Sequence, residues 1–383
     1  MFCFQKIVYR AIITAFVLFA FQTVASAADS APWPWMEKDL VLHIATGENN
    51  PRNSEGDFVI LDDGTILCVY THFLGNSGAD HATACLMSRS SSDGGQSWTT
   101  EDKLELENEG NCNIMCVTLR RLADGRVAIF YGVKESPSDC RPYMRIRQSD
   151  GTWGERLCLI TEPSYNTVNN DRTIQLSSGR ILVPVGRATF LGRNGNDYDY
   201  DLNCKCFCVI SDDGGKTWRE GESVEPTDGV FYQEPGLCEL ADGRLLMNIR
   251  TNDGVQYFAF SEDGGQTWGK PFKSCLDSPL SPTLIKRIPG SDELLAVGNS
   301  LRSDHATMTI DRIFTGRTTM TIERLVPDAS EILVRKTMEH SEKQDAPDWQ
   351  YPAICFLDDN TALVAYFSWT EGAFVYKIKL SDL

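Results

Sequence analysis

One eight-residue pattern, Ser-x-Asp-x-Gly-x-(Ser/Thr)-Trp, recurs along this chain and limits the architectures that it can adopt. Full copies occupy residues 91–98, 211–218 and 261–268, and a shortened copy occupies residues 149–153. The copies start 58, 62 and 50 residues apart, a period that is typical of propellers and solenoids. In each copy the Asp and Ser oxygens can accept the N–H groups of a turn, glycine tolerates positive φ, and Trp enters a hydrophobic layer. Each copy therefore predicts a β-hairpin.

A second repeat gives the number of structural units. An apolar strand end, a tight polar turn and a new apolar strand occur six times in succession. These turns lie within residues 61–67, 122–127, 176–182, 240–246, 288–294 and 357–363. The Asp-containing hairpins fall between such a turn and the next unit, as expected for the second hairpin of a four-stranded blade. The sequence therefore predicts an all-β fold, a six-bladed β-propeller with four-stranded antiparallel blades.

The first 27 residues have the composition of a secretory signal peptide. Lys6 and Arg10 precede an almost entirely apolar run over residues 11–24, and residues 25–27 read Ala-Ser-Ala, a typical cleavage site. The run is short for a membrane span, and an uncleaved anchor is the alternative. We therefore expect export to the periplasm or the extracellular space, with no membrane span in the mature chain. The predicted parts are a signal peptide 1–27, a lead-in segment 28–50 and a propeller 51–383.

The net charge and the cysteine content limit the classes of partner and cofactor that this chain is expected to bind. The chain has 36 Lys and Arg against 53 Asp and Glu, a net charge of −17, so nucleic acid and anionic membranes are unfavourable partners for its surface. Twelve cysteines follow the signal peptide, and one or two disulfides are expected in an oxidising compartment. The alternation of Cys204, Cys206 and Cys208 favours burial on one face of a strand. No Cys-x-x-Cys pair occurs and the five histidines stand singly, so neither a metal site nor a cofactor is predicted.

Polar and ionisable side chains stand at the same distance before four of the six turns. Four of them stand nine residues before a turn position: Glu55 before Gly64, Asn170 before Gly179, Glu234 before Gly243 and Tyr351 before Asn360. Allowing five or six residues for a strand, this register places each side chain at the start of an inner strand, at the mouth of the central channel. Side chains from different blades then converge, which indicates a site rather than core packing.

These positions resemble the active site of one family. The repeated hairpin is similar to the Asp box of the sialidase (neuraminidase) superfamily. The Asp box has a structural role in that family, and several unrelated propellers also contain it. The segment from Tyr232 to Arg250 closely resembles the family segment that carries a catalytic glutamate and an arginine, which become Glu234 and Arg250. The run that begins at Tyr351 matches the place of the nucleophilic tyrosine, and the run that begins at Asp80 resembles the loop with the acid/base aspartate.

The resemblance also implies three arginines that hold a substrate carboxylate. Arg52 and Arg250 match the first two positions, and the third is assigned to Arg317, with Arg302 and Arg141 as alternatives. Guanidinium groups suit this task because they form bidentate, charge-assisted hydrogen bonds to a carboxylate.

The activity that the resemblance implies is retaining hydrolysis of terminal α-linked sialic acid from glycans. A neutral tyrosine avoids the repulsion that a carboxylate nucleophile would meet from the acidic sugar, and sialidases are known exceptions to the two-carboxylate rule. Glu234 would accept the proton of Tyr351. Asp80 would protonate the leaving oxygen and then deprotonate water.

The sequence departs from the family pattern near its first arginine. The family usually shows an aromatic-Arg-Ile-Pro run, whereas residues 51–57 read Pro-Arg-Asn-Ser-Glu-Gly-Asp. Residues 169–172, Asn-Asn-Asp-Arg, add polar groups where the family commonly has small residues. In the pocket, the Glu55 carboxylate would accept hydrogen bonds from substrate hydroxyls, or it would repel an acidic group of the substrate. The alternatives are therefore the same mechanism on a different acidic sugar, transfer in place of hydrolysis, and a non-catalytic Asp-box propeller that binds glycan or protein.

Overall fold

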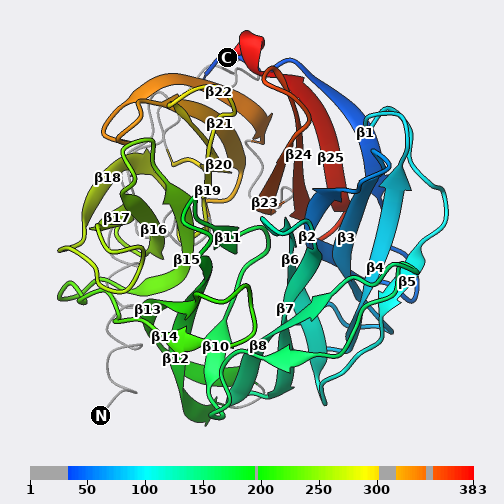
Figure 1. Ribbon diagram of the computed structural model, residues 1–383, viewed down its shortest axis with the longest axis horizontal. Coiled ribbons are helices and arrows are strands. Elements are labelled where there is room, and N and C mark those ends of the chain that lie inside the picture. The colour runs from blue at the N-terminus through cyan, green and yellow to red at the C-terminus, as the bar shows by residue number, and fades with distance from the viewer. Residues whose placement is uncertain (1–32, 195–196, 302–315, 342–347) are drawn as a thin grey trace, which may run out of the picture. The chain divides into compact units, whose positions relative to one another are not determined.

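The computed structural model describes residues 33–194, 197–301, 316–341 and 348–383 (Figure 1). These residues belong to one compact unit, Pro32–Leu383, and they form β-strands joined by turns, with a single 3-10 turn, η1 (Leu380–Asp382). The predicted signal peptide 1–27 lies outside the described residues. Within the described ranges, no helix is long and apolar enough to cross a membrane.

Four of the sheets have four antiparallel strands each, in agreement with the predicted blade. One contains β2 (Asn53–Ile60), β3 (Ile66–Phe73), β4 (Ala84–Ser91) and β5 (Lys103–Leu106). The next contains β15 (Tyr232–Glu239), β16 (Leu245–Thr251), β17 (Val255–Ser261) and β18 (Phe272–Asp277). A third contains β19 (Leu284–Arg287), β20 (Leu294–Asn299), β21 (Thr319–Leu325) and β22 (Ile332–His340). The fourth contains β23 (Trp349–Phe356), β24 (Thr361–Ser368), β25 (Gly372–Lys379) and β1 (Lys38–Ile44).

The remaining strands form one nine-stranded sheet where two separate four-stranded units were expected. One part holds β6 (Asn113–Arg121), β7 (Val127–Ser136), β8 (Asp139–Ile146) and β9 (Leu157–Cys158). The other holds β10 (Tyr165–Thr167), β11 (Ile174–Gln175), β12 (Ile181–Asn194), β13 (Asp197–Ser211) and β14 (Arg219–Glu220). The two parts are joined by one parallel pair, Tyr165 with Cys140. The Asn166 side chain reinforces this junction by donating to the Cys140 carbonyl at 3.0 Å.

The segment predicted to be a lead-in contributes a strand to the last sheet. Strand β1 pairs antiparallel with β25, with Lys38 opposite Ile378 and Ile44 opposite Ala373. The first described strand therefore completes a sheet whose other three strands come from the C-terminal part of the chain. Pairing of distant segments in one sheet ties both to the same hydrogen-bonded ladder.

The Asp-containing repeats form the hairpins that the pattern predicts. In the second full copy the Asp213 carboxylate accepts the N–H groups of Lys216 and Thr217 at 3.0 and 2.9 Å and the Thr217 hydroxyl at 2.6 Å. The glycines at 214 and 215 have φ of 73° and 89°, a region that favours glycine. The same contacts recur around Asp93 and Asp263. Each Asp box is therefore a closed local hydrogen-bond network with a structural role.

The hydrophobic core lies between the faces of neighbouring sheets. One cluster joins Phe58, Ile66 and Tyr70 of the first sheet to Leu363 and Val375 of the last. Burial of each such side chain contributes roughly 1.5–3 kcal/mol. The twelve cysteines in the described ranges are all free thiols, so the expected one or two disulfides are not formed. Many of these cysteines are buried on the strands, where a free thiol packs in the core like a small apolar side chain.

The innermost strands of neighbouring sheets contact one another in the middle of the unit (Figure 1). Strand β2 contacts β6 and β23, and β19 contacts β15 and β23. A buried charge network links them, because the Asp171 carboxylate binds Lys286 at 2.6 Å, Arg120 at 2.9 Å and the Ile354 N–H at 2.8 Å. Three inner strands are thus tied to one carboxylate, which fixes the side chains at their starting ends.

Candidate active site

Four inner strands carry a bulge at the same register, and each bulge holds one residue with positive φ. The pairing register shifts between Ser54 and Asp57, Met115 and Thr118, Gln233 and Gly236, and Gln350 and Ala353. The non-glycine residues at these bulges are Glu55 (φ 39°), Cys116 (φ 64°), Glu234 (φ 44°) and Tyr351 (φ 53°). A bulge redirects a side chain out of the strand's alternation, and strained backbone of this kind clusters at functional sites. The nine-residue register predicted from the turns is thus explained by a repeated bulge.

Asn170 fits this register in sequence but has a different structural role. The positive φ falls on the next residue, Asp171 (φ 53°). The Asn170 amide donates to the carbonyls of Gly56, Tyr351 and Pro352 at 3.0, 3.2 and 3.2 Å. It therefore links two neighbouring inner strands, β2 and β23.

All six residues predicted for the site line one cavity of about 640 Å³: Arg52, Asp80, Glu234, Arg250, Arg317 and Tyr351. A smaller side chamber of about 80 Å³ adjoins it and shares Asp80, Glu234 and Tyr351, and Glu55 and Lys134 line that chamber. The cavity volume lies in the range of ordinary small-ligand sites. Residues from five separate stretches of the chain converge here. The register predicts this for Glu234 and Tyr351, and the family resemblance implies it for the other four.

Tyr351, Glu234 and Arg250 form a hydrogen-bonded chain at the base of the cavity. The Tyr351 hydroxyl donates to Glu234 Oε1 at 2.8 Å, and Arg250 Nη1 donates to Glu234 Oε2 at 2.5 Å. The Tyr351 ring stacks on Phe367 with centroids 5.8 Å apart, which fixes its orientation. A tyrosine hydroxyl held by a carboxylate has a proton acceptor in place, which is the arrangement of an activated nucleophile.

The protonation states of this pair follow from burial and neighbouring charge. Burial would raise the pKa of Glu234, but the Arg250 cation, with Arg317, holds the pKa of this carboxyl below its usual value. Burial and the Glu234 charge raise the pKa of Tyr351 well above that of a free tyrosine, and Arg250 and Arg317 oppose the rise. The resting pair is therefore an ionised glutamate and a neutral phenol.

Arg52 and Asp80 form a second ion-paired group in the lining of the cavity. Arg52 Nη1 binds Asp80 Oδ1 at 2.7 Å and the Gly78 carbonyl at 3.1 Å. Arg52 also contacts Glu55, and its guanidinium carbon lies 4.0 Å from the centroid of the Trp369 ring. Partial desolvation would raise the pKa of Asp80, but Arg52 and then Lys134 hold it below its usual value.

The third predicted arginine, Arg317, completes the cationic side of the cavity. Its Nη2 donates to the Leu280 carbonyl at 2.9 Å. Burial and the neighbouring Arg250 lower the pKa of Arg317, as expected for two cations that face one region. Of the alternatives, Arg141 pairs with Asp139 at 2.9 Å and lines neither the cavity nor the side chamber. Arg302 lies outside the described residues.

An aromatic wall was not found from the sequence. Strands β12 and β13 are 14 and 15 residues long, and Tyr198 and Tyr200 of β13 line the cavity. The ring of His81, next to Asp80, lies 4.6 Å from that of Tyr198 between centroids. The alternation of aromatic residues at 198 and 200 was the one available signal.

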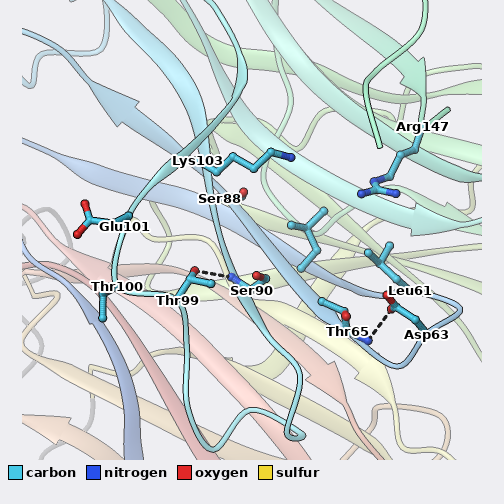
Figure 2. Close-up of a pocket in the computed structure, with 11 residues that line it drawn as sticks. Leu61, Asp63, Thr65, Ser88, Ser90, Thr99, Thr100, Glu101, Lys103 and Arg147 are labelled. Carbon is cyan, nitrogen blue, oxygen red and sulfur yellow. Dashed lines mark hydrogen bonds between the residues drawn. The ribbon is translucent and has the colours of Figure 1, made fainter. Parts of the chain in front are cut away.

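A separate surface pocket of about 590 Å³ lies over the first sheet and is shown in Figure 2. Its wall contains short polar side chains engaged in local bonds, such as Thr99, whose hydroxyl accepts the Ser90 N–H at 3.1 Å. Asp63 likewise accepts the Thr65 N–H at 2.9 Å. No residue of this pocket belongs to the predicted site, and its bonds are those of turns.

The chain belongs to the BNR repeat-like domain family, whose model matches residues 109–364. This range includes Glu234, Arg250, Arg317 and Tyr351. The chain is 46% identical over 63 residues, 16% of its length, to a sialidase from Micromonospora viridifaciens, of which the match covers 9%. It is 26% identical over 180 residues, 43% of its length, to Sialidase-3 from Mus musculus, of which the match covers 41%. The matches thus span less than half the length of these curated relatives.

Solved structures with low sequence identity share the fold. A Dyadobacter fermentans protein of unknown function has a TM-score of 0.67 at 19% identity, over 90% of this chain and 99% of that one. The Hadza microbial sialidase Hz136 has a TM-score of 0.70 at 15% identity, over 90% of this chain and 69% of that one. A Trypanosoma rangeli sialidase mutant that displays trans-sialidase activity has a TM-score of 0.67 at 14% identity, over 91% of this chain and 60% of that one. These structures show that the chain shares its fold with solved sialidases.

Proposed function

We propose that this protein is a retaining exo-glycosidase that hydrolyses terminal α-linked sialic acid with Tyr351 as its nucleophile. The observation that carries the proposal is the chain from Tyr351 to Glu234 to Arg250, with hydrogen bonds of 2.8 and 2.5 Å. A site that only binds glycan has no need of a proton acceptor on a buried tyrosine. The sialidase relatives support the same reading.

The substrate carboxylate would bind at the arginine side of the cavity. Arg250 and Arg317 lie close enough to lower the pKa of Arg317, and an anion between them would relieve their repulsion. Arg52 would join them by exchanging part of its contact with Asp80 for the carboxylate. Such charge-assisted hydrogen bonds are short and directional, so they would orient the anomeric carbon over Tyr351.

In the first step the Tyr351 oxygen would attack the anomeric carbon while its proton passes to Glu234. The glycosidic bond breaks, and Asp80 gives its proton to the leaving oxygen. In the second step water attacks the same carbon, Asp80 takes a proton from that water, and the tyrosine oxygen leaves and regains its proton from Glu234. Two inversions give net retention, and both catalytic groups return to their starting states.

We also propose the finer architecture expected from the repeats, a six-bladed propeller. Its support is the order of neighbour contacts, in which β2 touches β6 and β23, β15 touches β12, β13 and β19, and β19 touches β23. The nine-stranded sheet would then be two blades joined at β8 and β10. The site would lie where the inner strands of the blades begin.

Export after cleavage of residues 1–27 is a further proposal, based on the sequence of that segment. N-terminal sequencing of the secreted protein tests it. A start at residue 28 in the periplasmic or culture fraction supports export, and recovery of the intact chain from the cytoplasm contradicts it.

One observation favours a second candidate, the same mechanism on another acidic sugar. The side chamber next to Tyr351 is lined by Glu55 and Lys134, both almost fully buried. Charged groups at such a position favour hydroxyl or charged substituents over apolar ones, because an apolar group would exclude water from them without offering a hydrogen bond.

Release of a fluorophore from an aryl α-sialoside by residues 28–383 tests the proposal, with Tyr351→Phe and Glu234→Gln assayed beside it. Turnover by the parent and loss in both variants is the expected result. If all three folded proteins are silent, a panel of acidic aryl glycosides tests the second candidate. Silence there as well contradicts the enzymatic reading and leaves a binding propeller.

A further inference from the structure

Arg172 is a buried cation without a partner among the described residues. Its side chain is 2% exposed, and none of its three guanidinium nitrogens has a hydrogen-bond partner there. Only its backbone N–H is engaged, with the Thr118 hydroxyl at 3.0 Å. A buried guanidinium in this state costs folding free energy, because burial removes its hydration without replacing it.

The nearest acidic residue in sequence cannot neutralise it. The Asp171 carboxylate is already bound to Lys286, Arg120 and the Ile354 N–H. Burial lowers the pKa of Arg172 to about 10, against the opposing charges of Asp171 and Glu234. Arg172 is therefore still a cation at neutral pH, and Glu234 is one of the charges that keep it so.

The stem of Arg172 passes directly against the strand that carries Glu234. A Cβ placed on Gly236, two residues after Glu234, would lie 3.1 Å from Arg172 Cδ and 2.5 Å from Asn248 Oδ1. A side chain at position 236 would therefore clash with Asn248 and press against the stem of this arginine. Arg172 does not line the cavity or the side chamber, so a substrate in the cavity does not contact it.

Glu234 faces ionisable groups from several elements. Arg250 comes from β16, Tyr351 from β23, and Arg317 from the segment before β21. The thiols of Cys204 and Cys206 on β13 are also near its charge. Arg250 and Arg317 line the cavity, where a substrate carboxylate would compete for them. Arg172 also interacts with the charge of Glu234, and it lines neither the cavity nor the side chamber.

We propose that Arg172 is a positioning residue that keeps Glu234 ionised and stabilises the negative charge that develops on Tyr351 while substrate occupies the other arginines. Its catalytic consequence rests on the proposed glycosidase function. A fixed charge in a buried site acts strongly because little solvent screens it and no reorganisation is needed during the reaction. The same charge lowers the stability of the fold, so the residue exchanges stability for reactivity.

If Arg172 lowers stability and raises reactivity, its replacement should have opposite effects on the two. Replacement of an arginine with a purely structural role would lower stability and leave turnover unchanged. Arg172→Met keeps most of the volume and removes the unpaired charge, so thermal stability should be unchanged or higher. Turnover should fall about tenfold with KM within about twofold, and the acid limb of the pH profile should move up by about one unit, the equivalent of tenfold. Arg172→Lys should restore much of the turnover. Arg89→Met is the matched control, because Arg89 is paired with Asp102 at 2.5 Å outside the site and should lose stability but keep kcat.

The experiment combines kinetics with a direct titration of Glu234. The protein is labelled with 13Cδ-glutamate, the Glu234 signal is assigned by its loss in Glu234→Gln, and its pKa is measured in the parent and in Arg172→Met. A higher pKa in Arg172→Met supports the inference even if no substrate is turned over, so it is separable from the proposed function. An unchanged Glu234 pKa, or unchanged kcat and acid limb in an active enzyme, overturns it. If Arg172→Met does not fold, Arg172→Gln carries the same comparison, and if neither folds, Arg172 is a structural residue and the inference is wrong.

Discussion

Arg52 and Asp80 are joined by a 2.7 Å ion pair in which the arginine side chain is 1% exposed and the aspartate side chain is 59% exposed. The arginine is thus fixed in the wall, and the aspartate stands at the cavity surface. A substrate carboxylate that binds Arg52 would weaken its hold on Asp80. The pKa of Asp80, which Arg52 keeps low in the free protein, would then rise toward the value that a general acid requires.

The free enzyme should therefore work best in the acidic range. Glu234 must be ionised, so kcat/KM falls as pH drops below its pKa, which Arg250 holds low against burial. Asp80 must be protonated, so kcat/KM falls as pH rises above its pKa, which Arg52 also holds low. Both limits lie at acidic pH, and a pH profile of kcat/KM measures them.

Asp80→Asn is the control for that profile. It should lose the high-pH limb with an aryl glycoside, whose leaving group needs little protonation, and lose nearly all turnover of an alkyl-linked glycan. An optimum at neutral or alkaline pH, or an unaltered high-pH limb in Asp80→Asn, would remove Asp80 from the acid/base role.

Replacement of Arg250 by lysine should weaken substrate capture. Lysine cannot reproduce the planar fork that binds Glu234 and a substrate carboxylate together. Loss of a hydrogen bond between charged groups, about 1.5–3 kcal/mol, corresponds to about 10- to 150-fold in kcat/KM. Steady-state kinetics on the acidic substrate measures it. The control is Arg141→Lys, because Arg141 lies outside the cavity, and an equal loss in both variants would contradict the clamp.

Replacement of an Asp-box aspartate should change stability and not chemistry. Asp263 accepts two backbone N–H groups and the Thr267 hydroxyl, and these contacts, against the cost of desolvation, lower its pKa to about 2. Since the folded-state pKa is lowered, its contribution is present above the unfolded value of about 3.9 and is lost as pH falls toward 2. Asp263→Ala should lower the thermal midpoint at pH 7, by less at pH 2, and leave kcat of the folded protein unchanged. An altered kcat, or a shift independent of pH, would contradict a structural role.

The convergence of these side chains in one cavity is easier to predict from the sequence than the strand connections around them. The nine-residue register finds Glu55, Glu234 and Tyr351 because a β-bulge recurs at the same distance from each turn. It misassigns Asn170, since the left-handed residue there is Asp171, and a one-residue change of this kind leaves no mark in the local pattern. No sequence pattern identifies Arg172, because the absence of hydrogen-bond partners for its guanidinium depends on how distant segments pack around it.

The sheet pairing shows the same limit. The four-stranded units follow from turns and alternation, which are local. The parallel contact of Tyr165 with Cys140 and the pairing of β1 with β25 are long-range, and neither has a periodic signal. The expected disulfides are likewise not formed, because an even number of cysteines does not by itself bring any two thiols into bonding geometry.

The central claim is that Tyr351 forms the covalent bond to the sugar. The direct measurement is mass spectrometry of the protein after incubation with 2,3-difluorosialic acid, in which fluoride leaves and the second fluorine slows release of the bound sugar. We predict one adduct per chain, mapped to the peptide that contains Tyr351 and absent from Tyr351→Phe. An adduct on Glu234 or Asp80, or turnover of sialoside with no adduct at Tyr351, would contradict the account.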